Sequence, residues 1–328
     1  MISSLKINIT FINLSIIAES MQSFNVVLLG GKLGKLLGKK GTESDITLYS
    51  RKHEDILYTF VEPHTYPEKL SSLLQSINMA NAAVMNVSAI SPEFGETIVA
   101  LELLNIKQGL IITQNFPVEQ LKKIIRGTVV EDYKIVEMDF NAIIDSLASF
   151  KPSNCGFPLV VIDHFFKVKS VGTVILGVVK GGEIKKYQKL RVLPGDREVL
   201  VKSIQIHDVD VQTAGAGDRV GLSLKGIDIE ELDRGYLLTE ENSPLIADKI
   251  MKLKFEKTPF FKGEIKKEQK FMLSLGLFYE ACTIKNIEES GELIVETNKP
   301  VVYKSGDIAV LTRPELKGLR LIGKATME

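Results

Sequence analysis

The sequence predicts an α/β domain followed by two β-barrel domains. Residues 21–150 alternate continuous apolar runs with segments of helical period, the pattern of an open sheet with helices on both faces. Residues 155–242 and 243–328 instead contain many short alternating or β-branched runs, separated by turn residues and without a helical period. Residues 149–158 are rich in Pro, Gly, Ser and Asn and mark the boundary between the two patterns.

The elements of the first domain follow from local patterns. Residues 24–29, FNVVLL, are a continuous apolar run that ends at Gly30, as a buried parallel strand does. A Gly-rich turn then leads into a short basic helix that is expected to reach Lys40. Further strands are expected at residues 46–49, 56–61, 83–87, 109–113 and 133–136, the first two as a hairpin. Further helices are expected at residues 67–80, 92–104, 118–125 and 140–147.

The strands of the two barrels are predicted from alternation and turn residues. Residues 199–207 read V-L-V-K-S-I-Q-I-H, which alternates as a strand does. Two turns are expected before this strand, at Gly181-Gly182 and at Pro194-Gly195-Asp196. The other strands of the second domain are expected at residues 159–166, 171–179, 189–192 and 219–224. Those of the third domain are expected at residues 247–255, 271–277, 279–287, 292–297 and 306–311.

Composition excludes several classes of protein. The 328 residues carry 41 Lys+Arg and 41 Asp+Glu, so no global basic field attracts nucleic acid and any RNA contact must be local. Cys155 and Cys282 lack CxxC spacing, and the four histidines lack metal-ligand spacing. A disulfide framework and a metal site are therefore not expected, and a reducing cytoplasm is the expected compartment.

Residues 1–20 are expected to be a leader or an over-extended start, with Met21 as the natural initiator. Residues 7–18 are apolar but interrupted by polar side chains, and a spanning helix needs roughly 20 apolar residues. A signal peptide would lack its A-x-A cleavage site. An ordered extra strand or helix is the alternative.

Short motifs in the second domain carry a family resemblance. They are GTV at 172–174, KGG at 180–182, AGDRVG at 216–221, LKGI at 224–227 and LDRG at 232–235. These motifs resemble the second domain of elongation factor Tu and of archaeal-type elongation factor 1-alpha. The stretch VKSIQIHD at 201–208 resembles the selenocysteine-specific branch of that family. The resemblance implies a first domain with the P-loop GTPase fold and a third domain that is also a barrel. TPFFKG at 258–263 and GLRLIG at 318–323 are similar to parts of that third domain.

The phosphate-binding loop of the family is degenerate in this chain. Such a loop reads G-x-x-x-x-G-K-[ST], with backbone amides and Lys on the phosphates and a hydroxyl on Mg²⁺. This chain reads GGKLGKL at 30–36, which is one residue short and ends in Leu36 where the hydroxyl belongs. Gly30, Gly34 and Lys35 are therefore predicted to be vestiges of a nucleotide-binding site.

Three further family elements are also altered. Only residues 41–45 stand for the long switch segment, and they leave Thr42 without a mobile loop. The D-x-P-G-H element reads FVEPH at 60–64, without the metal-side Asp, although His64 aligns with the residue that positions water in the family. The guanine-reading N-K-x-D element reads TQNFP at 113–117, without its Asp. We expect no catalytic residue, no metal and no cofactor in this chain.

A basic segment of the third domain is the candidate RNA-binding surface. Seven lysines between residues 252 and 270 face three glutamates and are interleaved with phenylalanines. Clustered Lys neutralises phosphates and exposed aromatic rings stack on bases. The candidate residues are Lys257, Lys262, Lys266, Lys267, Phe260 and Phe261. The alternative is a solvated strand face.

The sequence therefore predicts a cytoplasmic protein like a translation elongation factor that does not hydrolyse GTP. Its expected partner is tRNA, the ribosome or another translation factor, with no membrane and no DNA partner. Gln212-Thr213 stands where the family carries an acidic residue, which argues against recognition of the aminoacyl ester. One alternative is an active, divergent GTPase that uses Lys35 with GTP and Mg²⁺. The other is a structural or regulatory protein-binding module outside translation.

Overall fold

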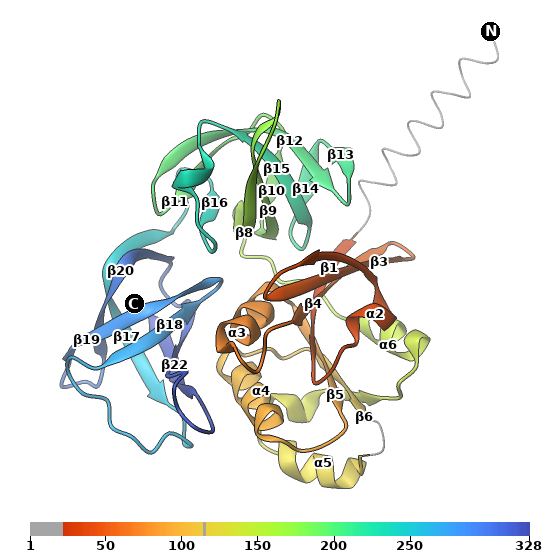
Figure 1. The fold of residues 1–328 in the computed structure, drawn as a ribbon, viewed down its shortest axis with the longest axis vertical. Helices are drawn as coiled ribbons and strands as arrows, with labels where there is room; N and C mark the ends of the chain where they lie inside the picture. Colours follow the sequence, from red (N-terminus) through yellow and green to blue (C-terminus); the bar gives the residue numbers. More distant parts are fainter. Residues whose placement is uncertain (1–21, 114–115) are drawn as a thin grey trace.

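The structure, a computed structural model, describes residues 22–113 and 116–328. It contains an α/β domain and two β-barrels arranged around a common junction (Figure 1), which confirms the predicted fold class. The predictions for residues 1–20, Met21, Gln114 and Asn115 lie outside the described residues. None of the helices in the described part of the chain is long and apolar enough to cross a membrane.

The first domain is a seven-stranded sheet with the order β2-β3-β4-β1-β5-β6-β7. Its strands are β1 Gln22–Leu29, β2 Lys39–Glu43, β3 Ile46–His53, β4 Ile56–Pro63, β5 Ala82–Val87, β6 Gly109–Thr113 and β7 Lys134–Val136. Strands β4, β1, β5, β6 and β7 are parallel to one another. Strands β2 and β3 extend the sheet through antiparallel pairing. All parallel strands therefore end at one edge, where loops of this fold gather.

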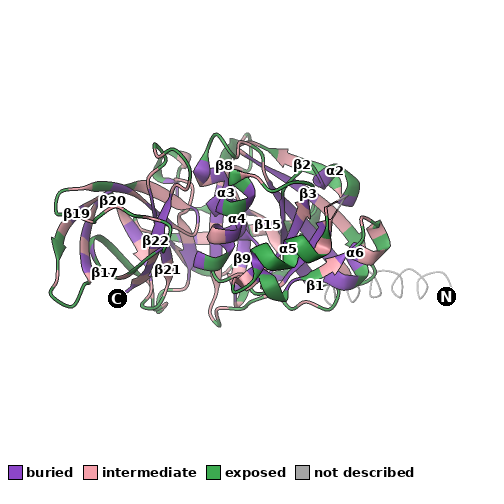
Figure 2. Cartoon of the chain, turned by 90° about the horizontal axis from the view of Figure 1, so that it is seen from below, coloured by how far each residue is buried: buried purple, intermediate pink, exposed green. Residues whose placement is uncertain are grey.

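Helices cover both faces of this sheet, as predicted. They are α2 Gly34–Leu37, α3 Leu70–Met79, α4 Pro92–Leu103, α5 Val118–Ile125 and α6 Phe140–Leu147, with a 3₁₀ helix, η1, at Val129–Asp132. Helices α3, α4 and α5 share one apolar cluster with the sheet, and α2 and α6 share the other. Figure 2 shows the strands between these layers as largely buried.

The basic helix expected up to Lys40 is shorter than predicted. Only Gly34–Leu37 is helical, and Lys39–Glu43 forms the edge strand β2. Lys40 pairs with Tyr49 on β3, so the backbone gains ladder hydrogen bonds that a four-residue helix cannot supply. The sequence KKGTE lacks apolar alternation, and therefore pairing rather than propensity determines this strand.

The second domain closes through six strands in the order β11-β16-β8-β9-β15-β12, with β12 pairing back to β11. They are β8 Leu159–Val168, β9 Gly172–Gly181, β11 Lys189–Leu193, β12 Arg197–Ile206, β15 Arg219–Lys225 and β16 Leu237–Thr239. Strand β13 Val209–Val211 extends β12, and β10 Glu183–Lys185 pairs with β14 Thr213–Gly215; a 3₁₀ helix, η2, spans Ile229–Glu231. The inward-facing Val and Leu side chains fill this barrel.

The third domain is a closed barrel with the order β17-β20-β19-β18-β21-β22. Its strands are β17 Ile246–Lys257, β18 Lys270–Leu275, β19 Phe278–Ile287, β20 Leu293–Tyr303, β21 Ile308–Thr312 and β22 Leu321–Met327. The barrel encloses its own apolar core, while Val310 and Leu321 on its outside pack into an apolar cluster of the first domain.

One apolar cluster joins all three domains. Ile46, Leu48 and Val61 of the first domain contact Val178 of the second and Leu277 of the third within it. Each of these side chains is at least about nine-tenths buried. The domains therefore pack against one another through apolar area as well as through polar contacts.

Buried or half-buried ion pairs tie the first domain to each barrel. In the second domain, Arg234 Nη1 donates hydrogen bonds to both carboxylate oxygens of Asp45, Oδ1 at 2.7 Å and Oδ2 at 2.8 Å. Burial alone would raise the pKa of the Asp45 carboxyl, but Arg234 holds it below its ordinary value. In the third domain, Arg320 Nε lies 3.0 Å from Glu96 Oε1, and Arg320 Nη1 donates to the Pro67 carbonyl oxygen at 2.7 Å.

Candidate functional site

The Gly-rich loop lies at the carboxyl edge of the parallel sheet, directly after β1. Gly30 has φ +77°, and a Cβ there would overlap the Asn86 carbonyl oxygen at the end of β5. Only glycine combines this backbone conformation with such a close approach. The fold therefore places the loop at the sheet edge where α/β proteins bind ligands.

Two side chains of the protein itself occupy the space at the start of helix α2. Glu62, near the end of β4, is 7% exposed, and its carboxylate accepts hydrogen bonds from Gly34 N at 3.4 Å and Tyr49 Oη at 3.1 Å. The Tyr49 ring packs so closely on Gly34 that a Cβ at residue 34 would overlap it. An internal carboxylate thus takes the backbone amide that a phosphate-binding loop leaves open for its ligand.

The hydroxyl of Tyr49 is fixed as the donor in this arrangement. Burial, followed by the Glu62 carboxylate, raises the pKa of Tyr49 to about 12. The phenol therefore keeps its proton at neutral pH and donates it to Glu62. The loop is closed by a neutral ring and one fixed negative charge, which repels an incoming phosphate.

The predicted vestigial residues are only partly brought together. Gly30 and Gly34 both lie in the loop, whereas the Lys35 side chain is exposed on the outer surface. Leu36, which stands where the family carries its Mg²⁺ hydroxyl, is 47% exposed. Lys32, rather than Lys35, lines the adjacent cavity.

That adjacent cavity has a volume of about 390 Å³ and lies between the loop, the end of β4 and helix α4. His64 lines it, and His64 Nε2 lies 3.8 Å from Glu43 Oε1. The Asn86 Oδ1 atom at the same edge is buried and accepts no hydrogen bond within the described protein. Residues 22–113 and 116–328 hold no group of three His, Cys, Asp or Glu side chains that could bind a metal ion.

The segment that stands for the guanine-reading element is described only in part. Thr113 ends β6, and the next two residues lie outside the described chain. The Phe116 ring packs against the apolar cluster under helices α4 and α5. A phenylalanine that packs inward here offers no acceptor for the edge of a base.

The basic segment of the third domain lies mainly in the connection between β17 and β18. Lys257 Nζ donates to the Gly263 carbonyl oxygen at 3.2 Å, and Lys262 Nζ donates to that of Pro259 at 2.9 Å. Lys266 Nζ lies 3.3 Å from Glu264 Oε2. The side chains of Lys257, Lys262, Lys266 and Lys267 are exposed. Their charges therefore remain accessible to a phosphate backbone.

The two aromatic candidates of this segment differ in burial. Phe260 is 64% exposed, whereas the Phe261 ring packs against the core of the third barrel. Lys257 Nζ lies 6.0 Å from the centre of the Phe261 ring, a distance at which cation–π attraction begins. Of the two rings, Phe260 is the one free to stack on an exposed base.

Glu62 and Tyr49 are site residues that the sequence patterns did not predict. A signal was present, because Glu62 interrupts the otherwise apolar run of β4. A charged side chain in a buried parallel strand needs a polar partner, which would have directed attention to the loop.

Comparisons with known proteins match both the sequence and the fold. The family model of elongation factor Tu domain 2 matches residues 172–239, within the second barrel. An uncharacterized protein of Methanocaldococcus jannaschii is 37% identical over 308 residues, which are 92% of this chain and 99% of that protein. The selenocysteine-specific elongation factor of the same organism is 30% identical over 303 residues, which are 82% of this chain and 63% of that factor.

The solved structures give the same architecture. Translation elongation factor SelB from Methanococcus maripaludis, in complex with the GTP analogue GppNHp, has a TM-score of 0.81 and 22% identity. The match covers 94% of this chain and 79% of that chain. The two chains thus share one architecture, an α/β domain followed by two barrels. The second barrel thus matches the elongation factor Tu domain 2 family, and the chain is similar over most of its length to a selenocysteine-specific elongation factor, of which it spans 63%.

Proposed function

We propose that this protein acts as a translation-factor body without a GTP cycle and binds tRNA, the ribosome or another translation factor. The observation that carries the proposal is the loop after β1, in which Glu62 and Tyr49 occupy the start of helix α2. A GTPase loop must bind the β- and γ-phosphates through open amides and hold Mg²⁺ through a hydroxyl. Here the carboxylate holds the amide of Gly34, and Leu36 replaces the hydroxyl.

The retained barrels support the binding half of the proposal. The match to elongation factor Tu domain 2 falls on the second barrel, and the relatives are named for translation elongation. Among possible partners, RNA best suits the exposed Lys262, Lys266 and Lys267 because clustered lysines neutralise adjacent phosphates. Exposed Phe260 adds an aromatic surface beside them.

Titration calorimetry with Mg-GTP tests the loss of the GTP cycle. The expected result is no measurable heat of binding at micromolar protein, because the loop offers no open phosphate cradle. A single-site exothermic isotherm that disappears in Lys35→Ala would contradict the proposal and support the divergent GTPase instead. Lys107→Ala, an exposed lysine on the same domain, is the matched control.

A fluorescence anisotropy titration against total tRNA tests the binding partner. Affinity should fall between about 50 and 200 mM salt, with a slope of roughly 0.7–0.9 per phosphate neutralised. Charge reversal at Lys262, Lys266 and Lys267 should weaken binding without lowering the melting temperature, because exposed lysines contribute little to folding.

The control for that titration reverses three exposed lysines of the first domain. They are Lys107, Lys122 and Lys123. Equal weakening in both triple variants would show that binding depends on overall charge and not on the third domain. Absence of any salt-dependent binding by the unmodified protein would reject RNA as the partner.

A further inference from the structure

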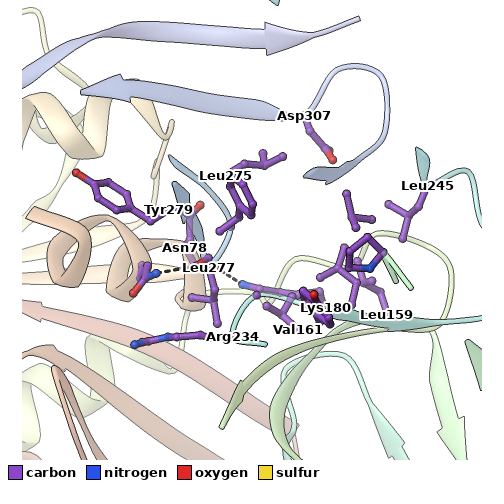
Figure 3. Close-up of a pocket in the computed structure, with 18 of the residues that line it drawn as sticks. Asn78, Leu159, Val161, Lys180, Arg234, Leu245, Leu275, Leu277, Tyr279 and Asp307 are labelled. Atoms are coloured by element: carbon purple, nitrogen blue, oxygen red, sulfur yellow. Dashed lines mark hydrogen bonds between the residues drawn. The ribbon is translucent and has the colours of Figure 1, made fainter. Parts of the chain in front are cut away.

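A cavity of about 530 Å³ lies where the three domains meet. Its wall includes Gln75 and Asn78 from helix α3, the end of β9, and the turn between β18 and β19 (Figure 3). This volume is in the range of pockets that hold small organic molecules. All three domains contribute, so a molecule bound here would contact each of them.

Lys180 is the one charged group on this wall that no carboxylate of the described chain compensates. Its Nζ donates to the Asn78 carbonyl oxygen at 2.6 Å, as the dashed line in Figure 3 shows. Among the described residues no Asp or Glu acts on Lys180, and the titratable group that favours its charged form is Cys155, which also lines the cavity. An ammonium removed from water without a counter-ion is costly.

The other cations of the wall are already neutralised from within the protein. Arg234 pairs with Asp45 at 2.7 Å, Lys299 with Asp233 at 2.7 Å and with Glu280 at 3.1 Å, and Lys304 with Asp307 at 3.0 Å. Their charges are therefore committed to the protein's own contacts. Within the described residues, Lys180 is thus the one cation of the wall without a carboxylate partner, whereas Lys299 is shared by two carboxylates, Asp233 and Glu280.

Apolar side chains from the second and third domains also line the cavity. They include Leu159, Val161, Leu245, Leu275 and Leu277 (Figure 3). Such a wall favours a hydrocarbon surface, whereas the lysine favours a negative charge. The two preferences are satisfied together by one amphiphilic anion.

We propose that this cavity binds a small molecule with an anionic head group on an apolar body, with the head on Lys180. The apolar body lies against the leucines contributed by the second and third domains. The ligand thereby links the three domains, and it stabilises their docked arrangement through mass action because the separated domains lack the site. A carboxylate and a phosphate monoester share the required chemistry.

Calorimetric titration of the full chain with octanoate, octyl phosphate and octylamine tests this proposal. The two anions carry different heads on one tail, and the amine carries the opposite charge. One-site binding of at least one anion, with no binding of the amine, is expected, and the tighter anion identifies the head group. Each bound anion should also raise the melting temperature with concentration.

Variants distinguish anion binding through Lys180 from nonspecific apolar binding. Lys180→Met keeps the length of the side chain and should weaken anion binding by at least about tenfold, the effect of losing a charge-assisted hydrogen bond. Leu245→Asp leaves the lysine in place and adds a negative charge to the wall, so it should weaken binding as well. Lys169→Met, on an exposed turn of the same barrel, should leave binding unchanged.

Three outcomes would overturn the assignment. Binding of octylamine as tight as that of the anions would show a merely apolar surface. Unchanged anion binding in both Lys180→Met and Leu245→Asp would place the ligand elsewhere. The absence of saturable binding by either anion would reject the site.

Discussion

At the scale of single residues, Glu62 determines the chemistry of the loop after β1. It lies 28 positions from Gly34 and 13 from Tyr49, and it accepts a hydrogen bond from each. A buried carboxylate is tolerated only when its oxygens are paired in this manner. Glu62 thus closes the loop, and the buried carboxylate is in turn stabilised by the hydrogen bonds from Gly34 and Tyr49.

Two replacements of Glu62 should therefore distinguish the contribution of its hydrogen bonds to stability from that of its side-chain volume. Glu62→Leu should lower the free energy of unfolding by about 1–3 kcal/mol because it leaves the Tyr49 hydroxyl and the Gly34 amide unpaired. Glu62→Gln keeps an acceptor and should cost less. Urea unfolding followed by circular dichroism measures both, with exposed Glu93→Gln as the control. Equal costs for Leu and Gln would show that the pairing contributes nothing.

Lys180 gives a second prediction at this scale, in the pH dependence of stability. Burial lowers the pKa of Lys180 to about 8, below its ordinary value of 10.5. The unfolded chain therefore binds more protons between these two values, so stability should rise with pH across that window. The gain is at most about 3 kcal/mol.

The measurement compares the unmodified protein with Lys180→Met. As the pH rises from about 8 to 10.5, the unfolding free energy of the unmodified protein should increase relative to that of Lys180→Met. Lys169→Met serves as the control, and its difference should stay flat. A pH-independent difference for Lys180→Met would mean that the folded protein does not depress the lysine's pKa.

At the scale of elements, helix α2 packs closely on strand β3 because Gly34 has no side chain. Gly34 opens the helix, and the Tyr49 ring on β3 fills the place where a Cβ would be. The helix has only four residues, too few to be stable on its own. Its position is therefore set by the strand against which it packs.

Gly34→Ala should accordingly destabilise the first domain. The added methyl group overlaps the Tyr49 ring, and overpacking of this kind costs typically about 1–3 kcal/mol. Gly41→Ala on the neighbouring strand is the matched control, since its nearest atom would be 3.5 Å away. Thermal unfolding checks both, and a melting temperature as low for Gly41→Ala would refute the packing argument.

At the scale of the whole molecule, polar contacts with small exposed area hold the three domains in one arrangement. The Glu96 and Arg320 side chains are 5% and 14% exposed and connect the first and third domains. Gln75 Nε2 also donates across this interface to the Leu277 carbonyl oxygen at 2.6 Å. Because these groups are partly desolvated, loss of one partner costs more than loss of the pair.

Arg320→Met should thus uncouple the third domain from the first. It leaves Glu96 buried without a counter-charge, which costs about 3–5 kcal/mol. Scanning calorimetry should show one transition for the unmodified protein and two for the variant. The double variant Arg320→Met with Glu96→Leu should recover the single transition.

The control for the uncoupling is Arg313→Met in the same domain. Arg313 pairs with Glu315, which is 61% exposed, so this ion pair contributes little to folding. The control should keep one transition at nearly the unmodified temperature. Two transitions in Arg313→Met, or a single one in Arg320→Met, would contradict a role for the Glu96–Arg320 pair in coupling the domains.

Sequence patterns were sufficient for the fold class because the barrels depend on local alternation. Residues 199–207 alternate visibly, and they lie largely within β12 at Arg197–Ile206. Strand β2 was missed because Lys39–Glu43 has no apolar alternation and is ordered only by pairing with β3. Local patterns cannot report a strand whose stability comes from its neighbour.

The candidate site was predictable only in its outline. Gly30 and Gly34 marked the loop, because the positions of glycines are visible in the sequence. The partners of Gly34 and the setting of Lys180 arise from contacts between distant segments, which no periodicity reports. Lys180 meets Asn78 across 102 positions and two domains.

The carboxylate on Gly34 has a consequence for competition. Glu62 belongs to the same chain, so its effective concentration at the amide is fixed by the fold, at roughly millimolar or above for a short tether. A free phosphate compound has to displace this tethered competitor, whose local concentration does not follow the cellular nucleotide pool. Occupancy of the loop by Glu62 is then set by the fold, and under the proposed function we expect partner binding to be independent of the ratio of GTP to GDP.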